Sequence, residues 1–271
     1  MKKYISILSL TLGLLVSTIA FVACGSSDDD STGGNSSDKQ SSKHIIKIIE
    51  EEGGSIYEST FTYDSQGRVI KIIESESSGE GTNSHSEKTY QYGETVIITK
   101  EITQESWSNG QIFSSSESHS FTLENGLIIK DEERQSNNTN SSTHTYNNAY
   151  NADGYLISIT ESGSGNNNSK EVKWTDGNIT NIGYNTFTYS NVPWVKGFPF
   201  YLKGSNMDSY LFAIGYYGII PKYLPSQYSS SETSGSRYDF TLQDNLVIKI
   251  IATPFVENNK HNKTTITIVW E

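Results

Sequence analysis

The sequence of 271 residues has little cysteine, little positive charge and few prolines. Its single cysteine, Cys24, excludes an intrachain disulfide. Lys and Arg number 20 against 31 Asp and Glu, which gives a formal net charge of −11. This charge argues against nucleic acid and anionic lipid headgroups as partners, because both attract clusters of basic residues. Four of the five prolines fall between Asn191 and Tyr228, where the pattern of the rest of the chain is interrupted.

Motifs of metal, nucleotide and nucleophile chemistry are also missing. No pair of histidines has a spacing such as HxxxH, and the sequence contains neither GxSxG nor a glycine-rich phosphate loop. The histidines are scattered over positions 44, 85, 119, 144 and 261. We therefore expect no metal, no cofactor and no enzymatic activity. A glycan-processing enzyme with paired carboxylates is the alternative, for instance Glu132 with Glu133 or Asp176 with Glu171, although neighbours on a strand point to opposite faces.

The segment Phe61–Ile73 is a hairpin unit that recurs along the chain. An alternating aromatic run ends in the turn Asp64-Ser65-Gln66-Gly67, and a β-branched run follows. Gly67 can adopt a positive φ, and Asp64 can accept a hydrogen bond from the backbone two residues on. Similar units occur around Tyr92, Gly126, Gly154, Gly177 and Asn245. The sequence therefore predicts an all-β protein, an antiparallel meander of about fourteen strands that forms a curved sheet or barrel-like body over residues 44–271.

One stretch, residues 191–228, departs from this pattern. It holds four prolines and an apolar run, Tyr210-Leu211-Phe212-Ala213-Ile214. Asn206 or Asp208 is a candidate N-cap of a short helix that Gly215 or Gly218 would end. We expect this helical and Pro-rich insertion to plug one mouth of the sheet or to cover one of its faces.

The amino terminus has the pattern of a lipoprotein signal. Two lysines, Lys2 and Lys3, precede an apolar stretch from Tyr4 to Val22, and Ala23 stands before Cys24. We expect residues 1–23 to be removed and Cys24 to carry fatty-acyl chains such as palmitate, which anchor the protein to a membrane. An uncleaved transmembrane anchor is the alternative. Residues 24–43 read as a flexible acidic and Ser/Gly linker.

Three resemblances follow from these segments. The acidic Gly25–Asp30 run resembles the export signal of surface lipoproteins of Bacteroidota-type outer membranes. The hairpin unit is similar to tyrosine-aspartate repeats of bacterial surface proteins. Over Ile56–Trp270 the chain resembles a family of Bacteroidota lipoproteins of unknown function with a porin-like fold. That likeness rests on Cys24, the YDxxGRV unit, Gly197-Phe198-Pro199-Phe200, Gly218–Pro225 and the segment from Tyr238 to Trp270.

The resemblance implies a lipid anchor in the outer membrane, at the cell surface or facing the periplasm, and it implies no functional residue. Many alternate strand positions are charged or hydroxylated, which favours a water-soluble barrel over a membrane-spanning one. Aromatic residues gather in and beside the insertion and could stack on a sugar or grip a partner protein. The candidate binding residues are Trp194, Tyr216, Tyr217 and Tyr223. We expect a non-enzymatic module that binds a glycan or a protein, with a purely structural envelope protein as a further alternative.

Overall fold

The computed structural model describes residues 43–78, 83–163, 166–256 and 262–271. These residues form sixteen strands and one short helix. The first eight strands are β1 (Ile45–Glu52), β2 (Ser55–Tyr63), β3 (Val69–Ser77), β4 (Asn83–Tyr92), β5 (Val96–Ser106), β6 (Ile112–Glu124), β7 (Leu127–Asn137) and β8 (Ser141–Tyr150). The others are β9 (Leu156–Gly163), β10 (Asn166–Thr175), β11 (Asn178–Ile182), β12 (Asn185–Pro193), β13 (Tyr223–Ser231), β14 (Ser234–Gln243), β15 (Leu246–Val256) and β16 (Thr264–Trp270). The helix is α1 (Ser209–Ala213).

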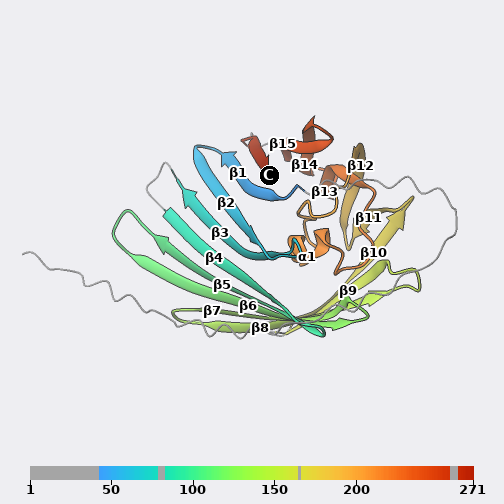
Figure 1. Cartoon of the computed structure of the whole chain (residues 1–271), viewed down its shortest axis with the longest axis horizontal. Helices are drawn as coiled ribbons and strands as arrows, with labels where there is room; N and C mark the ends of the chain where they lie inside the picture. Colours follow the sequence, from blue (N-terminus) through green and yellow to red (C-terminus); the bar gives the residue numbers. More distant parts are fainter. Residues whose placement is uncertain (1–42, 79–82, 164–165, 257–261) are drawn as a thin grey trace, which may run out of the picture. The chain divides into compact units, whose positions relative to one another are not determined.

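The strands form a closed antiparallel barrel in which each strand pairs with its neighbours in the sequence (Figure 1). Strand β1 closes the ring by pairing with β16, for example Ile48 opposite Ile268. Among the described strands, closure leaves no unpaired sheet edge. The prediction of an all-β antiparallel meander with a barrel-like body is therefore confirmed, although the strands number sixteen rather than about fourteen.

The insertion is shorter than the sequence predicted, because the last part of the predicted segment forms strand β13. We expected the insertion to extend to residue 228, because four of the five prolines lie between Asn191 and Tyr228. Pro225 nevertheless lies within β13, opposite Tyr189 of β12, where the register between the two strands shifts. A register shift is one of the places where a sheet accepts proline. The insertion proper is thus residues 194–222, between β12 and β13.

The predicted turn residues lie at chain reversals. Gly67, Gly126 and Gly154 have φ values of +74°, +78° and +83° in the turns that follow β2, β6 and β8. Asn245 takes the same left-handed conformation, with a φ of +63°, in the turn between β14 and β15. Asparagine is among the residues that tolerate this region best after glycine. The hairpin unit recognised in the sequence is therefore the repeating element of the barrel.

The insertion lies within the ring of strands, as the position of α1 in Figure 1 shows. Its contacts reach strands on different sides of the ring. The Tyr216 carbonyl accepts a hydrogen bond from Ile128 at the start of β7, and Phe198 stacks on Trp270 at the end of β16. Gly218 fits against the turn after β8, where an added Cβ would overlap the Gly154 carbonyl oxygen. The expectation that this segment plugs one mouth of the barrel agrees with these contacts.

The plug, residues 194–222, meets the end of the barrel at which β1 starts, here called the plugged end. Because antiparallel strands alternate in direction, the turns after β2, β4, β6 and β8 share this end with the start of β1. The buried core gathers here, and twelve side chains are the largest of those that are almost completely buried. They are Tyr217, Phe121, Phe212, Ile45, Ile72, Ile97, Ile128, Leu156, Ile179, Ile182, Leu211 and Leu224. The other end is called the far end.

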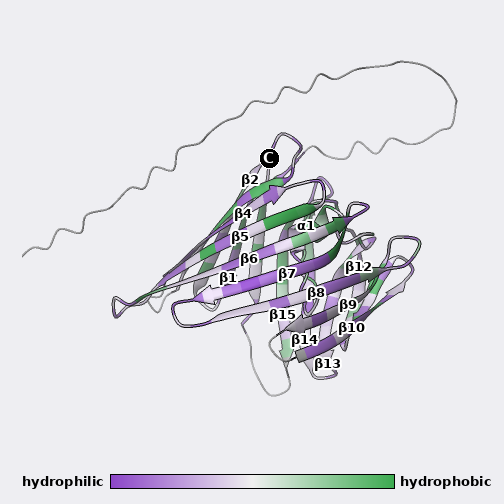
Figure 2. Cartoon of the chain, turned by 90° about the horizontal axis from the view of Figure 1, so that it is seen from below, coloured by the Kyte–Doolittle hydropathy of each residue, from purple (hydrophilic) through white to green (hydrophobic). Residues whose placement is uncertain are grey.

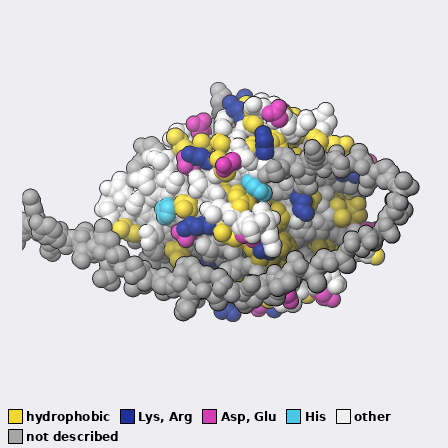
Figure 3. Space-filling view, viewed as in Figure 1, with side chains coloured by type: hydrophobic (Ala, Val, Ile, Leu, Met, Phe, Trp, Pro, Cys, Tyr) yellow, Lys and Arg dark blue, Asp and Glu magenta, His cyan; other side chains and the backbone are white. Residues whose placement is uncertain are grey.

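The outer wall of the barrel carries many polar side chains. Alternation along a strand sends Lys47 and Lys71 outward, where they pair with Glu58 and Glu87 at 2.7 Å in each case. Hydrophilic residues recur along β6, β7 and β8 in Figure 2, and charged side chains of both signs stand among hydrophobic ones in Figure 3. No helix within the described residues is long and apolar enough to cross a membrane.

Candidate functional site

Asp208 fixes the plug to the barrel wall. Its carboxylate caps α1 by accepting hydrogen bonds from the backbone N–H groups of Tyr210 and Leu211, at 3.0 and 2.9 Å. The same group pairs with Lys88 of β4 at 2.9 Å and accepts a hydrogen bond from the Tyr90 hydroxyl at 3.0 Å. Burial works to raise the pKa of Asp208, but Lys88 and these hydrogen bonds hold it below its usual value. The charge of Asp208 therefore connects the insertion to β4.

His119 of β6 is held between two carboxylates on the inner wall. Its Nδ1 lies 2.9 Å from Oδ1 of Asp131, and its Nε2 lies 2.8 Å from Oε1 of Glu117. The imidazole also stacks on Phe121, with ring centroids 5.2 Å apart. Burial works to lower the pKa of His119, but the hydrogen bonds to Asp131 and Glu117 outweigh it and raise this pKa to about 10. His119 is thus an imidazolium that neutralises two inward carboxylates.

Replacing His119 by glutamine is expected to lower the free energy of unfolding by about 2–3 kcal/mol, because hydrogen bonds between charged groups are lost. The folded-state pKa lies above the usual 6.5, so this stabilisation is complete below pH 6.5 and disappears as the pH rises to about 10. Urea unfolding across that range tests the expectation. His85→Gln on β4, whose side chain is exposed, is the control. A difference between wild type and H119Q that does not change with pH would contradict the charge assignment.

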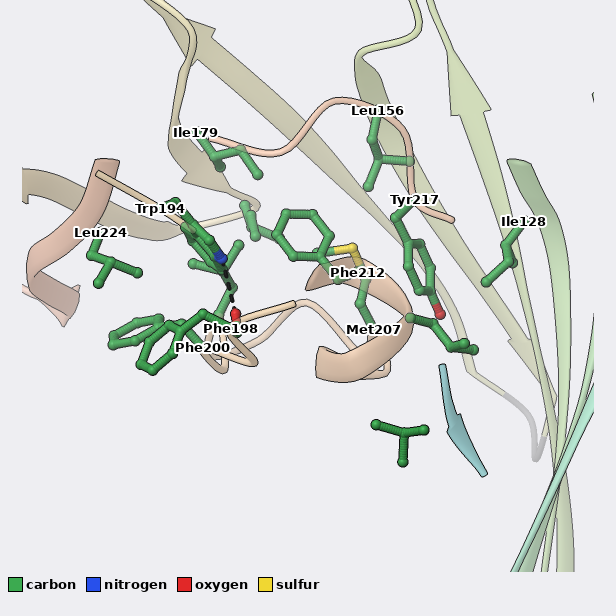
Figure 4. Packing of buried hydrophobic residues seen from close by; sticks show 14 of the residues in the cluster. Ile128, Leu156, Ile179, Trp194, Phe198, Phe200, Met207, Phe212, Tyr217 and Leu224 are labelled. Carbon is green, nitrogen blue, oxygen red and sulfur yellow. Dashed lines mark hydrogen bonds between the residues drawn. The ribbon is translucent and has the colours of Figure 1, made fainter. Parts of the chain in front are cut away.

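Two of the four predicted binding residues lie in the core. Trp194 and Tyr217 are only 7% and 2% exposed. The Trp194 indole N–H donates to the Phe198 carbonyl at 2.9 Å, and its ring meets Phe200 and Phe212 edge to face (Figure 4). Both rings fill the plug, where they exclude water but offer no face to a ligand. The expectation that they form a binding surface is corrected here: they hold the plug together.

The other predicted residues are spread out. Tyr216 is half-buried against Tyr92, and Tyr223, 38% exposed, starts β13. Cys24 lies outside the described residues. The first carboxylate pair considered for glycan cleavage is also divided between two partners: Glu133 accepts a hydrogen bond from Tyr146 in the interior, whereas Glu132 pairs with Lys130. These residues do not form one site.

The interior of the barrel contains a chain of adjoining hollows between the plug and the far end. One, of about 410 Å³, is lined by β1 to β5 and includes Glu50, Glu74 and Glu101. A second, of about 280 Å³, shares Glu101 and Thr103 with the first and extends along β5 to β8. The linings contain residues at the far ends of strands, such as Glu52 and Asn137. The hollows therefore reach the far rim of the barrel.

A third hollow has a different lining. It measures about 470 Å³ and lies between the insertion and the walls formed by β1 to β3 and β14 to β16. One side carries Glu50, Glu52, Ser59 and Glu74, which it shares with the first hollow. The rest of the lining is largely apolar and aromatic, and it also holds Lys203 and the hydroxyl residues Ser209, Ser236 and Thr264. Its apolar and aromatic members are Ile48, Phe198, Pro199, Phe200, Tyr201, Tyr210, Tyr238, Ile250, Ala252, Pro254, Ile266 and Ile268. We name it the mixed hollow.

The carboxylates of the mixed hollow are crowded. Burial raises the pKa of Glu50, and repulsion from Glu52 and Glu74 adds to the shift while Lys203 opposes it. Burial also raises the pKa of Glu74, with a further contribution from Glu101. Over the described ranges, no group of three or more His, Cys, Asp and Glu side chains is arranged to hold a metal ion. The crowded carboxylates are thus suited to hydrogen bonding and to the attraction of a positive charge.

Sequence reasoning did not find this site. Glu50, Ser59 and Tyr238 are about 190 positions apart at the extremes, and only closure of the barrel through β1 and β16 brings them to one hollow. The sequence did offer two signals: Glu74 follows Ile72 by two positions on the strand that continues the hairpin unit, and Phe198 and Phe200 stand in the aromatic insertion. The alternation of side chains along a strand does not by itself show which face of the strand points into the barrel.

Comparison with known proteins agrees with this architecture. A porin-like protein from Bacteroides uniformis ATCC 8492 aligns with a TM-score of 0.59 and 17% identity, covering 84% of this chain and 96% of that one. A porin-like protein from Bacteroides vulgatus ATCC 8482 aligns with a TM-score of 0.44 and 11% identity, covering 84% and 99%. At 17% identity the first likeness concerns the fold alone. No curated protein matches the chain.

The family comparison is more specific. Nothing in it supports the likeness to tyrosine-aspartate repeats, which depends on turn residues alone. Residues 61–252, more than half of the chain, match the model of a domain of unknown function, DUF4595, described as having a porin-like fold. The chain belongs to the DUF4595 family of domains with a porin-like fold.

Proposed function

We propose that this protein is a non-enzymatic, lipid-anchored binding module of the outer membrane that holds its ligand inside the barrel. The observation that carries this proposal is the insertion, which fills the plugged end while leaving hollows of about 280 to 470 Å³ toward the far rim. A barrel filled at one end is a cup and not a channel. Hollows of this size match the pockets that take small ligands, and a folded protein partner could enter only with a protruding segment.

Several features support the proposed location and lipid anchor of the protein. The polar and charged outer wall, with its ion pairs such as Lys47 with Glu58, suits contact with water better than contact with lipid tails. Attachment then falls to Cys24, whose position after an apolar stretch matches a lipoprotein signal. The mass of the mature chain tests this part of the proposal. A chain that begins at an acylated Cys24 supports it, and a chain that still contains Ala23 contradicts it.

Ala252 offers a direct test of binding in the cup. It lines the mixed hollow on β15, opposite Tyr238 of β14. We expect Ala252→Trp to fill the hollow and to abolish the signals that the wild-type protein gives on a glycan array and a peptide panel. Thr253→Trp is the matched control, because the next residue on a strand points to the opposite face. Signals that survive in A252W, with both variants folded by circular dichroism, would place the ligand outside the mixed hollow.

A further inference from the structure

We propose that the mixed hollow takes a small amphipathic cation, with an ammonium or guanidinium head at Glu50, Glu52 and Glu74 and an apolar body against Phe200, Tyr238 and Ile250. This inference rests on the proposed function, since it names the ligand class of the same cup. It goes beyond an acidic cluster, because the hollow joins carboxylates and an apolar wall in one space of about 470 Å³.

The apolar wall is rigid where a ligand body would lie. Phe200 is 7% exposed, and its ring meets Tyr238 edge to face with centroids 5.1 Å apart. The same ring packs on Trp194 from the plug, with centroids 5.8 Å apart. Ile250 is buried on β15 directly across from Phe240 of β14. An aromatic surface fixed in this way accepts apolar groups with little loss of side-chain freedom, and its ring faces attract cations.

The carboxylates of this hollow differ from those deeper in the barrel. Asp208 is neutralised by Lys88, and Asp131 by His119. Glu74, in contrast, accepts a weak hydrogen bond from the Ser59 hydroxyl at 3.3 Å, and the ion pairs formed within the described wall involve other carboxylates. Glu50 is half-buried, and Glu52 and Glu74 are exposed. Three carboxylates that line one hollow without such neutralisation favour a ligand that brings positive charge.

The other charges around the hollow agree with this choice. Lys203 of the insertion lines the same space, and its Nζ lies 5.8 Å from the centre of the Tyr228 ring. Lys88 is engaged by Asp208. One ammonium group therefore faces three carboxylates, and an anionic head would meet a net negative surface. Removal of Lys203 would raise the preference for a cation, an effect that a purely structural role of Lys203 does not produce.

Three probes with the same eight-carbon chain test the inference by isothermal titration calorimetry below their micelle concentrations. They are octylammonium, octyl glucoside and octanoate. We expect octylammonium to bind and octanoate to bind at least roughly tenfold more weakly. The double variant E50Q/E74Q should lose at least roughly tenfold in octylammonium affinity, and K203Q should gain affinity. Glu51→Gln is the matched control, because Glu51 stands next to Glu50 on the opposite, exposed face of β1.

The outcomes separate this inference from the proposed function. Octyl glucoside or octanoate could bind as tightly as octylammonium and lose this binding in A252W. That result would show that the ligand need not be a cation, while still supporting a ligand site inside the barrel. Binding of octylammonium that is unchanged in both E50Q/E74Q and A252W would overturn the inference, because the cation would then lie elsewhere. If none of the three probes binds, the ligand is not an amphipathic cation and the inference is wrong. The glycan array and the peptide panel then test the proposed function by themselves. Thermal unfolding of each variant confirms that it is folded.

Discussion

Replacing Asp208 by asparagine is expected to lower the free energy of unfolding by about 3–5 kcal/mol, the range for breaking a buried ion pair. The side chain of Asp208 is 5% exposed, and its partner Lys88 is 20% exposed. Asparagine retains an oxygen that can cap α1, so the variant removes the charge more than the cap. The loss therefore measures what it costs to leave Lys88 in the barrel without its carboxylate.

Urea unfolding of four variants separates the contribution of the buried ion pair from that of the helix N-cap. The variants are D208N, D208A, K88M and the double variant K88M/D208N. D208A should lose about 1 kcal/mol more than D208N, because the N-cap is removed as well. The double variant should be more stable than D208N, since no unpaired charge remains buried. Glu87→Gln is the control, as it removes a surface pair with Lys71 at 2.7 Å and should cost about 1 kcal/mol or less.

The pH dependence of the same variants has a defined sign. The folded-state pKa of Asp208 lies below the usual 3.8, so its contribution is present above pH 3.8 and is lost as the pH falls through the lower, folded-state value. Wild type and D208N should therefore differ most near neutral pH and converge in acid. A constant difference over this range would show that Asp208 acts through packing and not through its charge.

Much of the barrel could be predicted, because each hairpin is specified by residues that lie close together in the sequence. A turn with Gly67 between an aromatic run and a β-branched run specifies a hairpin without reference to the rest of the chain. Asp208 before Tyr210 similarly specifies a helix start, and α1 begins at Ser209 as that cap requires. Strand β13 was not predicted, since its Pro225 is accommodated only by a register shift opposite Tyr189 in a neighbouring strand.

The candidate site could not be predicted in the same way, because its information is not local. Nothing in the sequence places Glu50 and Glu74 beside the insertion, and they come to line one hollow with Phe200 only when the insertion enters the ring. The aromatic composition of the insertion did indicate an important segment. It did not distinguish rings that fill the plug, such as Trp194, from rings that line a hollow, such as Tyr201, because both kinds occur within a few residues of one another.

Replacing Trp194 by alanine is expected to lower the free energy of unfolding by about 3–5 kcal/mol, the range for truncating a buried large aromatic residue. The ring fills the space between Phe200 and Phe212, and its N–H satisfies the Phe198 carbonyl within the plug. Trp194→Phe should lose less, because it keeps the aromatic contact and gives up the hydrogen bond and part of the volume. Tyr223→Ala, at an exposed position, should change stability by about 0.5 kcal/mol or less.

Binding measurements on the same variants show whether Trp194 acts in the core or on a ligand. If the ring belongs to the core, W194A that remains folded should bind octylammonium less well only to the extent that Phe200 moves, and W194F should bind almost as wild type does. If the ring instead formed a glycan or protein surface, W194F would abolish signals on the glycan array or peptide panel without a matching loss of stability. Because Trp194 is 7% exposed and Phe200 separates it from the mixed hollow, the first result is expected.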